Sequence, residues 1–424
     1  MTDLAAELET ASDELAAYFA DPGQFSNPYD MFRRLRDQEP VHWSKWNSWV
    51  VTGHPEALEL LQSKHLGRAP SANQQFRGLG LRDIDASDVV EAVDIQLAAI
   101  INRDPPDHTR LRRLVSRAFS PRVVMGWDAR IRVIVDQLVD NVQDLQQFDL
   151  LHDLAYLLPA TVICELLNVP FDEMQEIMLG QGLSHTRVMT VRGKGAEEVS
   201  AAPDDLRRLT QNALVKQTAY FRELIAERKR KPGDDLISTL AMIEDEGDVL
   251  STEELIGTTI LLIGAGHETT ANLIGNGMYE LLTNRSQFEL LKRDPDLMPV
   301  ALEEILRYAT PSRGQPRTAI DRIEIAGKTI EPGDQVSVIL MACNRDPRVF
   351  DDPETFDLTR TDNRHITFTA GVHYCLGAAL AKAEAAVMFR AICDRLGDLE
   401  LAVDEVKWRP AYVRGLVELP VRRG

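Results

Sequence analysis

The residue best suited to metal chemistry is Cys375, which lies between Gly371 and Gly377 and directly ahead of an Ala- and Leu-rich run. The glycines let the backbone bend where a side chain would clash with a flat ligand, and the amides that start the next helix favour a thiolate. One thiolate is too few for structural zinc, which takes four ligands, but it suits an iron held by a porphyrin. We therefore predict a haem bound through Cys375. The alternative is a buried structural cysteine.

A second feature is the polar pair Glu268 and Thr269, which follows a long apolar stretch containing Gly264 and Gly266. Each interior glycine costs about 1 kcal/mol relative to alanine, so two in one buried helix indicate that something flat or bulky approaches its backbone. The Thr269 hydroxyl can bond to a carbonyl one turn earlier and help to open the helix into a groove. The plainer alternative is that Glu268 is salt-bridged and Thr269 only packs.

Taken in order, these motifs resemble those of the cytochrome P450 family. Phe368, the glycines, the basic His373 and Cys375 follow the order of its haem-binding signature, and the resemblance runs from about Tyr29 to the C-terminus. One departure is Thr369, where the family usually has glycine. The resemblance implies a mainly α fold with small β-sheets, in which a long central helix crosses a haem b with Cys375 as its axial ligand.

The resemblance also assigns roles to other residues. Thr269 would hydrogen-bond to the oxygen that is being activated, and Glu268 would relay protons from solvent. Cofactor contacts are implied for positions that match the propionate-binding cations and the haem-facing residues of the family: His108, Arg112, Arg317, His373, Gly266, Phe368 and Gly377. Each charged member of this set, taken alone, could be an ordinary surface charge.

Glu304 and Arg307 are three residues apart on one helix face and can form an ion pair. Such a pair is usually a weak surface feature. By resemblance, it matches the pair that fastens the region behind the cysteine loop. The arginine that the family commonly adds later is replaced here by Thr355, and Arg360 and Arg364 are possible substitutes.

Substrate contacts are predicted for one set of apolar residues: Val93, Leu97, Leu262, Ile263 and Val413. Arg313 is placed by the resemblance on the cavity wall, where the family generally has an apolar residue. A buried arginine is costly unless it is hydrated or paired. We expect Arg313 either to meet a polar or carboxylate group of an otherwise apolar substrate, or to turn toward solvent or a haem propionate.

Basic residues concentrate between Thr109 and Arg132 in a chain of net charge −19. A basic patch on an acidic protein indicates a specific acidic partner, and the resembling family receives electrons on this face. The candidates for docking an acidic ferredoxin are therefore Arg113, Arg117 and Lys382, with a solvated face as the alternative. No flavin or dinucleotide fingerprint is present, so we expect no bound flavin or nicotinamide, and electrons that come from separate proteins.

Together these features predict a haem-thiolate monooxygenase of the bacterial type. It would insert one atom of O2 into a small or medium hydrophobic molecule by hydroxylation or epoxidation, with secondary metabolism as its setting. A peroxide-driven peroxygenase is one alternative, although Glu268 and Thr269 speak against it because that reaction needs no proton relay. A non-catalytic haem protein is the other.

Several classes of protein are disfavoured by the sequence. The net charge disfavours nucleic-acid binding. A zinc-protease motif that begins at His267 fails because residue 271 is Ala271 instead of a second histidine. Four widely spaced cysteines indicate a reducing compartment, and the N-terminus shows neither a signal peptide nor an apolar anchor. We predict a cytoplasmic protein with no membrane insertion.

A single domain over residues 1–424 is expected, since no linker rich in Pro, Gly or Ser divides the chain, and residues 1–27 are interpreted as an N-terminal extension. Candidate lid loops are residues 69–107 and 180–203. Periodicity predicts helices over Tyr29–Asp37, Glu56–Leu61, Thr109–Ala118, Val124–Gln143, Leu151–Leu167, Asp204–Lys229, Thr252–Leu282, Leu297–Ala309 and Leu376–Arg395. Strands are predicted over Trp49–Thr52, Arg322–Ile325, Val336–Leu340 and Leu416–Val421.

Overall fold

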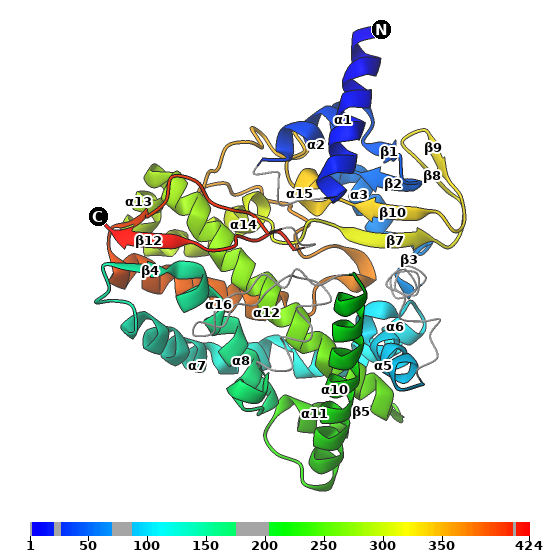
Figure 1. Cartoon of the computed structure of the whole chain (residues 1–424), viewed down its shortest axis with the longest axis vertical. Helices are drawn as coiled ribbons and strands as arrows, with labels where there is room; N and C mark the ends of the chain where they lie inside the picture. The colour runs from blue at the N-terminus through cyan, green and yellow to red at the C-terminus, as the bar shows by residue number, and fades with distance from the viewer. Residues whose placement is uncertain (1, 21–26, 70–86, 175–202, 410–412) are drawn as a thin grey trace. The chain divides into compact units, whose positions relative to one another are not determined.

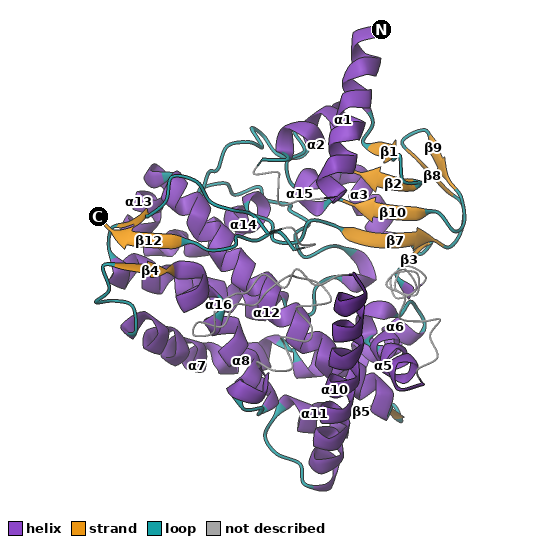
Figure 2. Ribbon diagram, viewed as in Figure 1, coloured by secondary structure: helices purple, strands orange, loops and turns teal. Residues whose placement is uncertain are grey.

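The computed structural model describes residues 2–20, 27–69, 87–174, 203–409 and 413–424 (Figure 1). Helices make up most of this part of the chain and strands form small sheets (Figure 2). The chain forms two compact units. The first contains Met1–Gly67, Ile131–Leu158 and Thr269–Gly424, and the second contains Arg68–Arg130 and Pro159–Glu268. The expectation of one folding domain stays a prediction.

A five-stranded sheet is the main β element of the first unit. Its strands lie in the order β1 (Val41–Trp43), β2 (Ser48–Val51), β10 (Gln335–Val338), β7 (Gln315–Ala319) and β3 (Leu66–Gly67). Only the β2–β10 pair is parallel. The inward residues of these strands pack with those of α3 (His54–Gln62), so this sheet fixes β7, which carries Arg317.

Two N-terminal helices pack beside this sheet (Figure 1). They are α1 (Thr2–Ala20) and α2 (Tyr29–Gln38), and they share an apolar cluster with the short helix α15 (Leu340–Cys343). In this cluster Tyr18 and Phe32 meet edge to face, with ring centroids 5.4 Å apart. The N-terminal extension therefore contains a packed helix, which the sequence analysis did not predict.

Three further helices belong to the first unit, among them the one that carries the Glu304–Arg307 pair and the one that follows the cysteine loop. They are α13 (Arg285–Arg293), α14 (Met298–Tyr308) and α16 (Ala378–Ala391). A three-stranded antiparallel sheet joins β11 (Leu399–Leu401), β12 (Pro420–Arg423) and β4 (Gln147–Asp149). A hairpin joins β8 (Ile323–Ile325) to β9 (Lys328–Ile330).

The described part of the second unit is largely helical. It contains α5 (Ser87–Ala98), α6 (Asp107–Ala118), α10 (Pro203–Arg230) and α11 (Leu236–Met242), with a hairpin of β5 (Glu244–Asp245) and β6 (Asp248–Val249). Three helices continue from one unit into the other: α7 (Pro121–Asp140), α8 (Leu157–Leu167) and α12 (Thr252–Thr283). No helix among the described residues is long and apolar enough to cross a membrane.

The predicted helices are confirmed within a few residues at their ends, but some strand limits are wrong. Leu340 begins α15 and does not end a strand, because an apolar run cannot show where the backbone changes from extended to helical. Leu416 makes only an isolated bridge to Trp408, and the paired strand there is Pro420–Arg423. The limits of that strand are determined by its hydrogen bonds to β4 and β11, which are distant in the sequence. A local sequence pattern cannot show such pairing.

The prediction of an irregular lid over residues 69–107 is wrong for part of its length. Ser87–Ala98 forms α5, whose buried Val89, Ala92 and Val93 have helical spacing. The aspartates and glycines around this segment concealed the pattern. Residues 70–86, and all of the second candidate lid except Pro203, lie outside the described residues.

Candidate functional site

The loop ahead of Cys375 is held by hydrogen bonds within the loop. The Cys375 amide donates to the Phe368 carbonyl at 3.0 Å, and the Thr369 hydroxyl donates to the His373 carbonyl at 3.0 Å. Thr369 has φ 63°, in the left-handed region that favours glycine. The departure from the family pattern therefore falls on a residue whose backbone is strained, and its hydroxyl bond offsets part of that cost.

The space around residue 371 excludes any side chain, so only glycine fits there. Gly371 has φ 71°, and a Cβ atom there would lie 2.3 Å from the carbonyl oxygen of Leu61. The loop thus packs against the end of α3 at a distance that only glycine permits. This contact fixes the turn that presents Cys375 to the start of α16.

Cys375 is the cysteine that lies outside the core. The other three are buried, and burial raises the pKa of Cys164 to about 12 and that of Cys393 to about 11. Burial also raises the pKa of Cys343. A thiolate ligand needs a site where the anion is tolerated, so Cys375 is the suitable cysteine of the four.

The residues around Cys375 fit a flat iron-containing group. A Cβ atom at Gly377 would meet no other atom within 4 Å, and the same holds for Gly266 in the second unit. Among the described residues, no three His, Cys, Asp or Glu side chains gather in a way that could hold a metal ion. A single protein thiolate with open space beside glycines is the donor set that a porphyrin complements.

The predicted propionate-binding cations fall into two sets. Arg317 and His373 belong to the first unit, where Arg317 is buried in β7 and donates to the Pro316 carbonyl at 2.9 Å. His108 and Arg112 lie one turn apart on α6 of the second unit, and His108 is buried. Each set offers cations suited to a carboxylate.

The long helix α12 begins with the predicted capping box. The Glu254 amide donates to the Ser251 hydroxyl at 3.1 Å, and the Ser251 amide donates to the Glu254 carboxylate at 2.8 Å. The helix continues to Thr283, and the opening expected at Thr269 stays a prediction. Glu268 and Thr269 are adjacent and partly buried on it.

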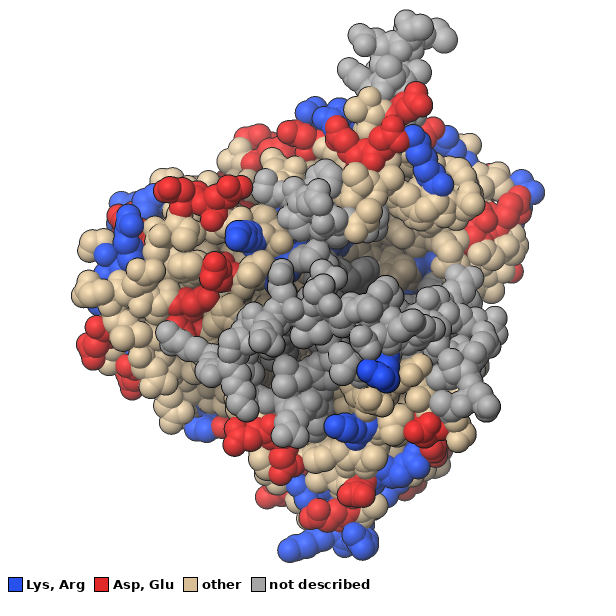
Figure 3. Space-filling model, viewed as in Figure 1, with Lys and Arg blue, Asp and Glu red and all other residues tan. Residues whose placement is uncertain are grey.

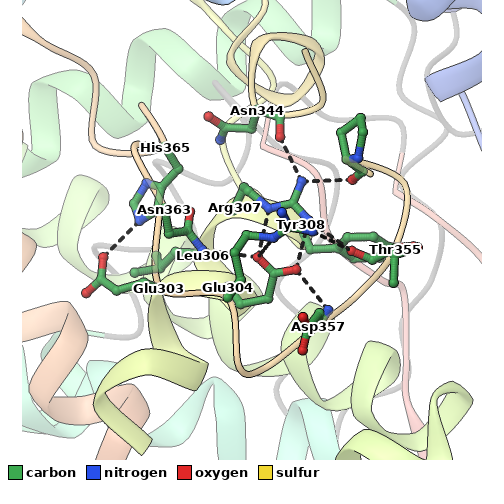
Figure 4. Close-up of polar contacts among 12 residues, drawn as sticks. Glu303, Glu304, Leu306, Arg307, Tyr308, Asn344, Thr355, Asp357, Asn363 and His365 are labelled. Carbon is green, nitrogen blue, oxygen red and sulfur yellow. Dashed lines mark hydrogen bonds and ion pairs between the residues drawn. The ribbon is translucent and has the colours of Figure 1, made fainter. Parts of the chain in front are cut away.

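Glu304 and Arg307 form an ion pair in which both side chains are 0% exposed. Figure 4 shows how the surrounding loop converges on them. Arg307 also donates to the carbonyls of Asn344, Pro353 and Thr355, at 2.8 to 3.1 Å. Every charge of the pair is therefore met by an opposite charge or a peptide dipole, as a buried ion pair requires.

The third charged member of this network is Arg360. Its Nε lies 3.2 Å from Glu304 Oε2, whereas Arg364 pairs with the exposed Asp362. Glu304 also accepts from the Asp357 amide and from the Asn363 side chain. The carbonyl of Thr355, and not its side chain, takes part.

A neighbouring cluster was missed by the sequence analysis. Glu303 accepts hydrogen bonds from His365 at 3.0 Å and from Lys382 at 2.6 Å (Figure 4 shows the His365 contact). Burial tends to raise the pKa of Glu303, but these two hydrogen bonds outweigh it and lower the pKa to about 2. The Lys382 ammonium also lies 5.5 Å from the Phe368 ring centroid. The predicted docking cation is thus engaged beside the cysteine loop.

The apolar substrate candidates occupy different surroundings. Val93 and Leu97 are buried in a cluster with Ala92 and Leu214 of the second unit. Ile263 is fully buried on α12, and Leu262 is partly exposed. Val413 bridges Ser312 in the first unit, which places it beside the segment that carries Arg313.

Arg313 is buried and turned toward α1. Its Nη1 donates to the Tyr18 hydroxyl, its Nη2 donates to the Arg409 carbonyl at 3.1 Å, and its guanidinium lies over the Tyr18 ring. Arg313 is 5% exposed, so the expected turn toward solvent is not found, and it forms no ion pair with an acidic side chain in the described part of the chain. These contacts offset part of its cost of burial, while its Nε has no hydrogen-bond partner among the described residues.

The arginines of α6 are paired with the β5–β6 hairpin. Arg113 forms ion pairs with Asp245, Glu246 and Asp248, and Arg117 forms one with Asp245. The predicted basic patch is therefore neutralised in part within the second unit. Elsewhere, the face drawn in Figure 3 intersperses charges of both signs.

Comparisons with known proteins agree on one family. The model of the family described as Cytochrome P450 matches residues 91–397. The polyketide biosynthesis cytochrome P450 PksS of Bacillus subtilis is 35% identical over 93% of this chain and 95% of its own. The 6-deoxyerythronolide B hydroxylase of Saccharopolyspora erythraea is 36% identical over 93% and 95%.

A solved structure shows the same fold. P450BioI, in complex with an acyl carrier protein bearing hexadec-9Z-enoic acid, has a TM-score of 0.81 and 34% identity to this chain. The match covers 94% of this chain and 99% of that one.

Proposed function

Because this chain belongs to the cytochrome P450 family, whose named relatives include monooxygenases and hydroxylases, we propose that it inserts one atom of O2 into a hydrophobic small molecule. The observation that carries the proposal is the Cys375 loop, which presents one accessible thiol beside glycine-lined space while the other cysteines are buried. Relatives in secondary metabolism support a substrate from that chemistry.

The residues present fit haem b with Cys375 as its protein ligand. When bound, the haem supplies the iron at which dioxygen is reduced and cleaved. His108, Arg112, Arg317 and His373 would hold its propionates. Gly266 and Gly377, at each of which a Cβ atom would meet no other atom within 4 Å, would leave room for it.

Thr269 and Glu268 would deliver the protons that the reaction consumes. The Thr269 hydroxyl would donate a hydrogen bond to the reacting oxygen, and the Glu268 carboxylate, partly exposed on α12, would bring protons from solvent. The overall reaction takes two electrons and two protons with O2 and substrate, and it yields oxygenated product and one water. We assign the electrons to a separate ferredoxin, consistent with the predicted docking face around α6.

We further propose that the substrate is neutral at the group nearest Arg313. Both terminal nitrogens of this arginine already donate to Tyr18 and to the Arg409 carbonyl, so a carboxylate would have to displace one of these contacts. We therefore assign Arg313 a structural role, in place of the expected contact with a carboxylate group of the substrate.

The test is turnover in isotopically labelled dioxygen. The purified holoenzyme would be supplied with NADPH, a ferredoxin and its reductase, and screened against neutral hydrophobic compounds that shift the ferric haem to high spin. A monooxygenase places one labelled atom in the product. Label absent from the product, with turnover restored by peroxide alone, would identify a peroxygenase, and no turnover under either condition would indicate a non-catalytic haem protein.

A further inference from the structure

Four polar side chains lie along one face of α12. Thr269, Asn272, Asn276 and Glu280 are spaced three, four and four residues apart, which places them within about 60° of Thr269 around the axis of an α-helix. All four belong to the first unit. Successive members are about 4.5 to 6 Å apart along the helix axis. The mechanism described above uses only the first of them.

The two asparagines are buried and incompletely hydrogen-bonded. Asn272 is 0% exposed, and neither its Oδ1 nor its Nδ2 has a partner among the described residues. Asn276 is 2% exposed; its Nδ2 donates to the Arg414 carbonyl at 2.9 Å, but its Oδ1 has no described partner. Buried amides of this kind are normally satisfied by ordered water, which would be a suitable partner for both asparagines.

The C-terminal segment closes over these amides. A Cβ atom at Gly415 would lie 2.1 Å from Asn272 Oδ1, so the backbone approaches the amide as closely as a glycine allows. The cover also contains Arg414, whose guanidinium is stacked on Trp408 at 3.5 Å. The 414–415 backbone therefore shields these amides from bulk solvent.

Glu280 lies at the far end of the stripe and is partly exposed. Within the described residues, its carboxyl group makes no hydrogen bond and no ion pair. Burial raises the pKa of Glu280 to about 7, although Arg345 and Arg414 oppose the shift. The tyrosines that share this environment are Tyr279, beside it on α12, and Tyr308 on α14. A carboxyl group in this state can release and regain a proton near neutral pH.

We propose that this face of α12 is a water-filled proton path that leads from Glu280, past Asn276 and Asn272, to Thr269. The proposal rests on the monooxygenase function above and adds a proton source to Glu268. The axial spacing of about 4.5 to 6 Å between successive members is similar to the span of about 5.6 Å that two hydrogen bonds through one water cover. An amide both donates and accepts, so it can orient the waters on either side of it.

The path has a defined chemical consequence. Each proton leaves the Glu280 carboxyl group, moves along the waters to the Thr269 hydroxyl, and is replaced from bulk water. With four electrons from the ferredoxin and four protons, O2 is reduced to two waters; with two electrons and two protons it is released as hydrogen peroxide. A weakened proton supply therefore raises the fraction of reducing equivalents that is lost as peroxide.

The first test is infrared titration of the ferric holoenzyme. We expect a protonated-carboxyl band that titrates near pH 7 and is lost in Glu280→Gln. Glu400→Gln, which changes an exposed carboxylate on β11, is the matched control. No titrating band in the wild type overturns the proposal without any variant being needed.

The second test measures the peroxide fraction during oxidation of NADPH through a ferredoxin, with no substrate added. We expect a several-fold rise in Glu280→Gln and in Asn276→Leu, which keeps the carboxyl group but removes the amide. The double variant should be no worse than either single variant, because both interrupt one path. Wild-type peroxide fractions in both variants, or additive effects, would reject the path. A normal thiolate-haem spectrum in that case shows that the proposed function itself survives.

Discussion

Arg307 donates from Nε and Nη2 to the two oxygens of Glu304, at 2.8 Å each, with neither side chain exposed. The pair is joined to the loop that precedes the cysteine segment through the carbonyls of Pro353 and Thr355. It therefore connects α14 to that loop, whose path leads to Phe368 and Cys375. Removing one partner would leave the other charge buried without compensation.

Replacing Arg307 with Lys should destabilise the protein by about 3–5 kcal/mol, because an ammonium cannot reproduce the paired donors. The measurement is urea unfolding together with haem content after purification. Arg322→Lys, at an exposed arginine, is the control and should leave the free energy of unfolding nearly unchanged. Equal stability of the Arg307 variant and the control would refute the structural role.

Acid stability should depend on Glu303. Its pKa of about 2 in the folded protein lies below the value of 4.5 for an ordinary Glu, so the unfolded chain binds the proton first as the pH falls. Its contribution is complete above pH 4.5 and is lost between about 4.5 and 2. Glu303→Gln should therefore flatten the fall in melting temperature over this window. An acid titration identical to that of the wild type would show that Lys382 and His365 do not hold this carboxylate in solution.

The β5–β6 hairpin should compete with an acidic redox partner. Asp248 and the 81%-exposed Glu246 form ion pairs with Arg113. Replacing both carboxylates with amides would therefore leave more of the positive charge of Arg113 available to a partner. We expect ferredoxin affinity to rise several-fold at low ionic strength and the gain to shrink at high salt. Calorimetric titration at two salt concentrations measures this. Weaker binding in the hairpin variant would place the docking surface elsewhere.

Arg313 should act on stability and leave ligand charge preference unchanged. Arg313→Ala removes the contacts to Tyr18 and to the Arg409 carbonyl, and we expect a loss of about 2–4 kcal/mol. Tyr18→Phe removes only the hydroxyl and should cost about 1 kcal/mol. Spin-state titrations with myristic acid and its methyl ester should give the same preference in wild type and Arg313→Ala. A preference for the acid that disappears in the variant would restore the carboxylate-anchor hypothesis.

The sequence predicted the helices and the cysteine segment because both depend on local spacing. The ring of groups around Glu304 includes Arg360, whose participation depends on a loop path that no local pattern records. The pairing of Arg113 with the hairpin is non-local as well. By contrast, the spacing of Asn272, Asn276 and Glu280 is present in the sequence, but it becomes informative only when their burial is known.

The strain at Thr369 illustrates the same distinction. The sequence marks it as a departure from glycine, and the structure supplies the reason that glycine is usual there, a φ of 63°. The compensating hydroxyl bond to the His373 carbonyl could be recognised only from coordinates. The sequence motif thus shows where glycine is preferred, and the backbone dihedral angle at Thr369 explains the preference.

The most direct test of the account is the absorption spectrum of the reduced protein under carbon monoxide, for the wild type and for Cys375→Ser. If Cys375 is the ligand, the wild type should show the strongly red-shifted Soret band of a thiolate-ligated haem, and the variant should lose it. Cys393→Ser, at a buried cysteine, should keep the band. A wild-type spectrum without that shift, or a shifted band that survives in Cys375→Ser, would contradict the assignment of Cys375 as the haem ligand.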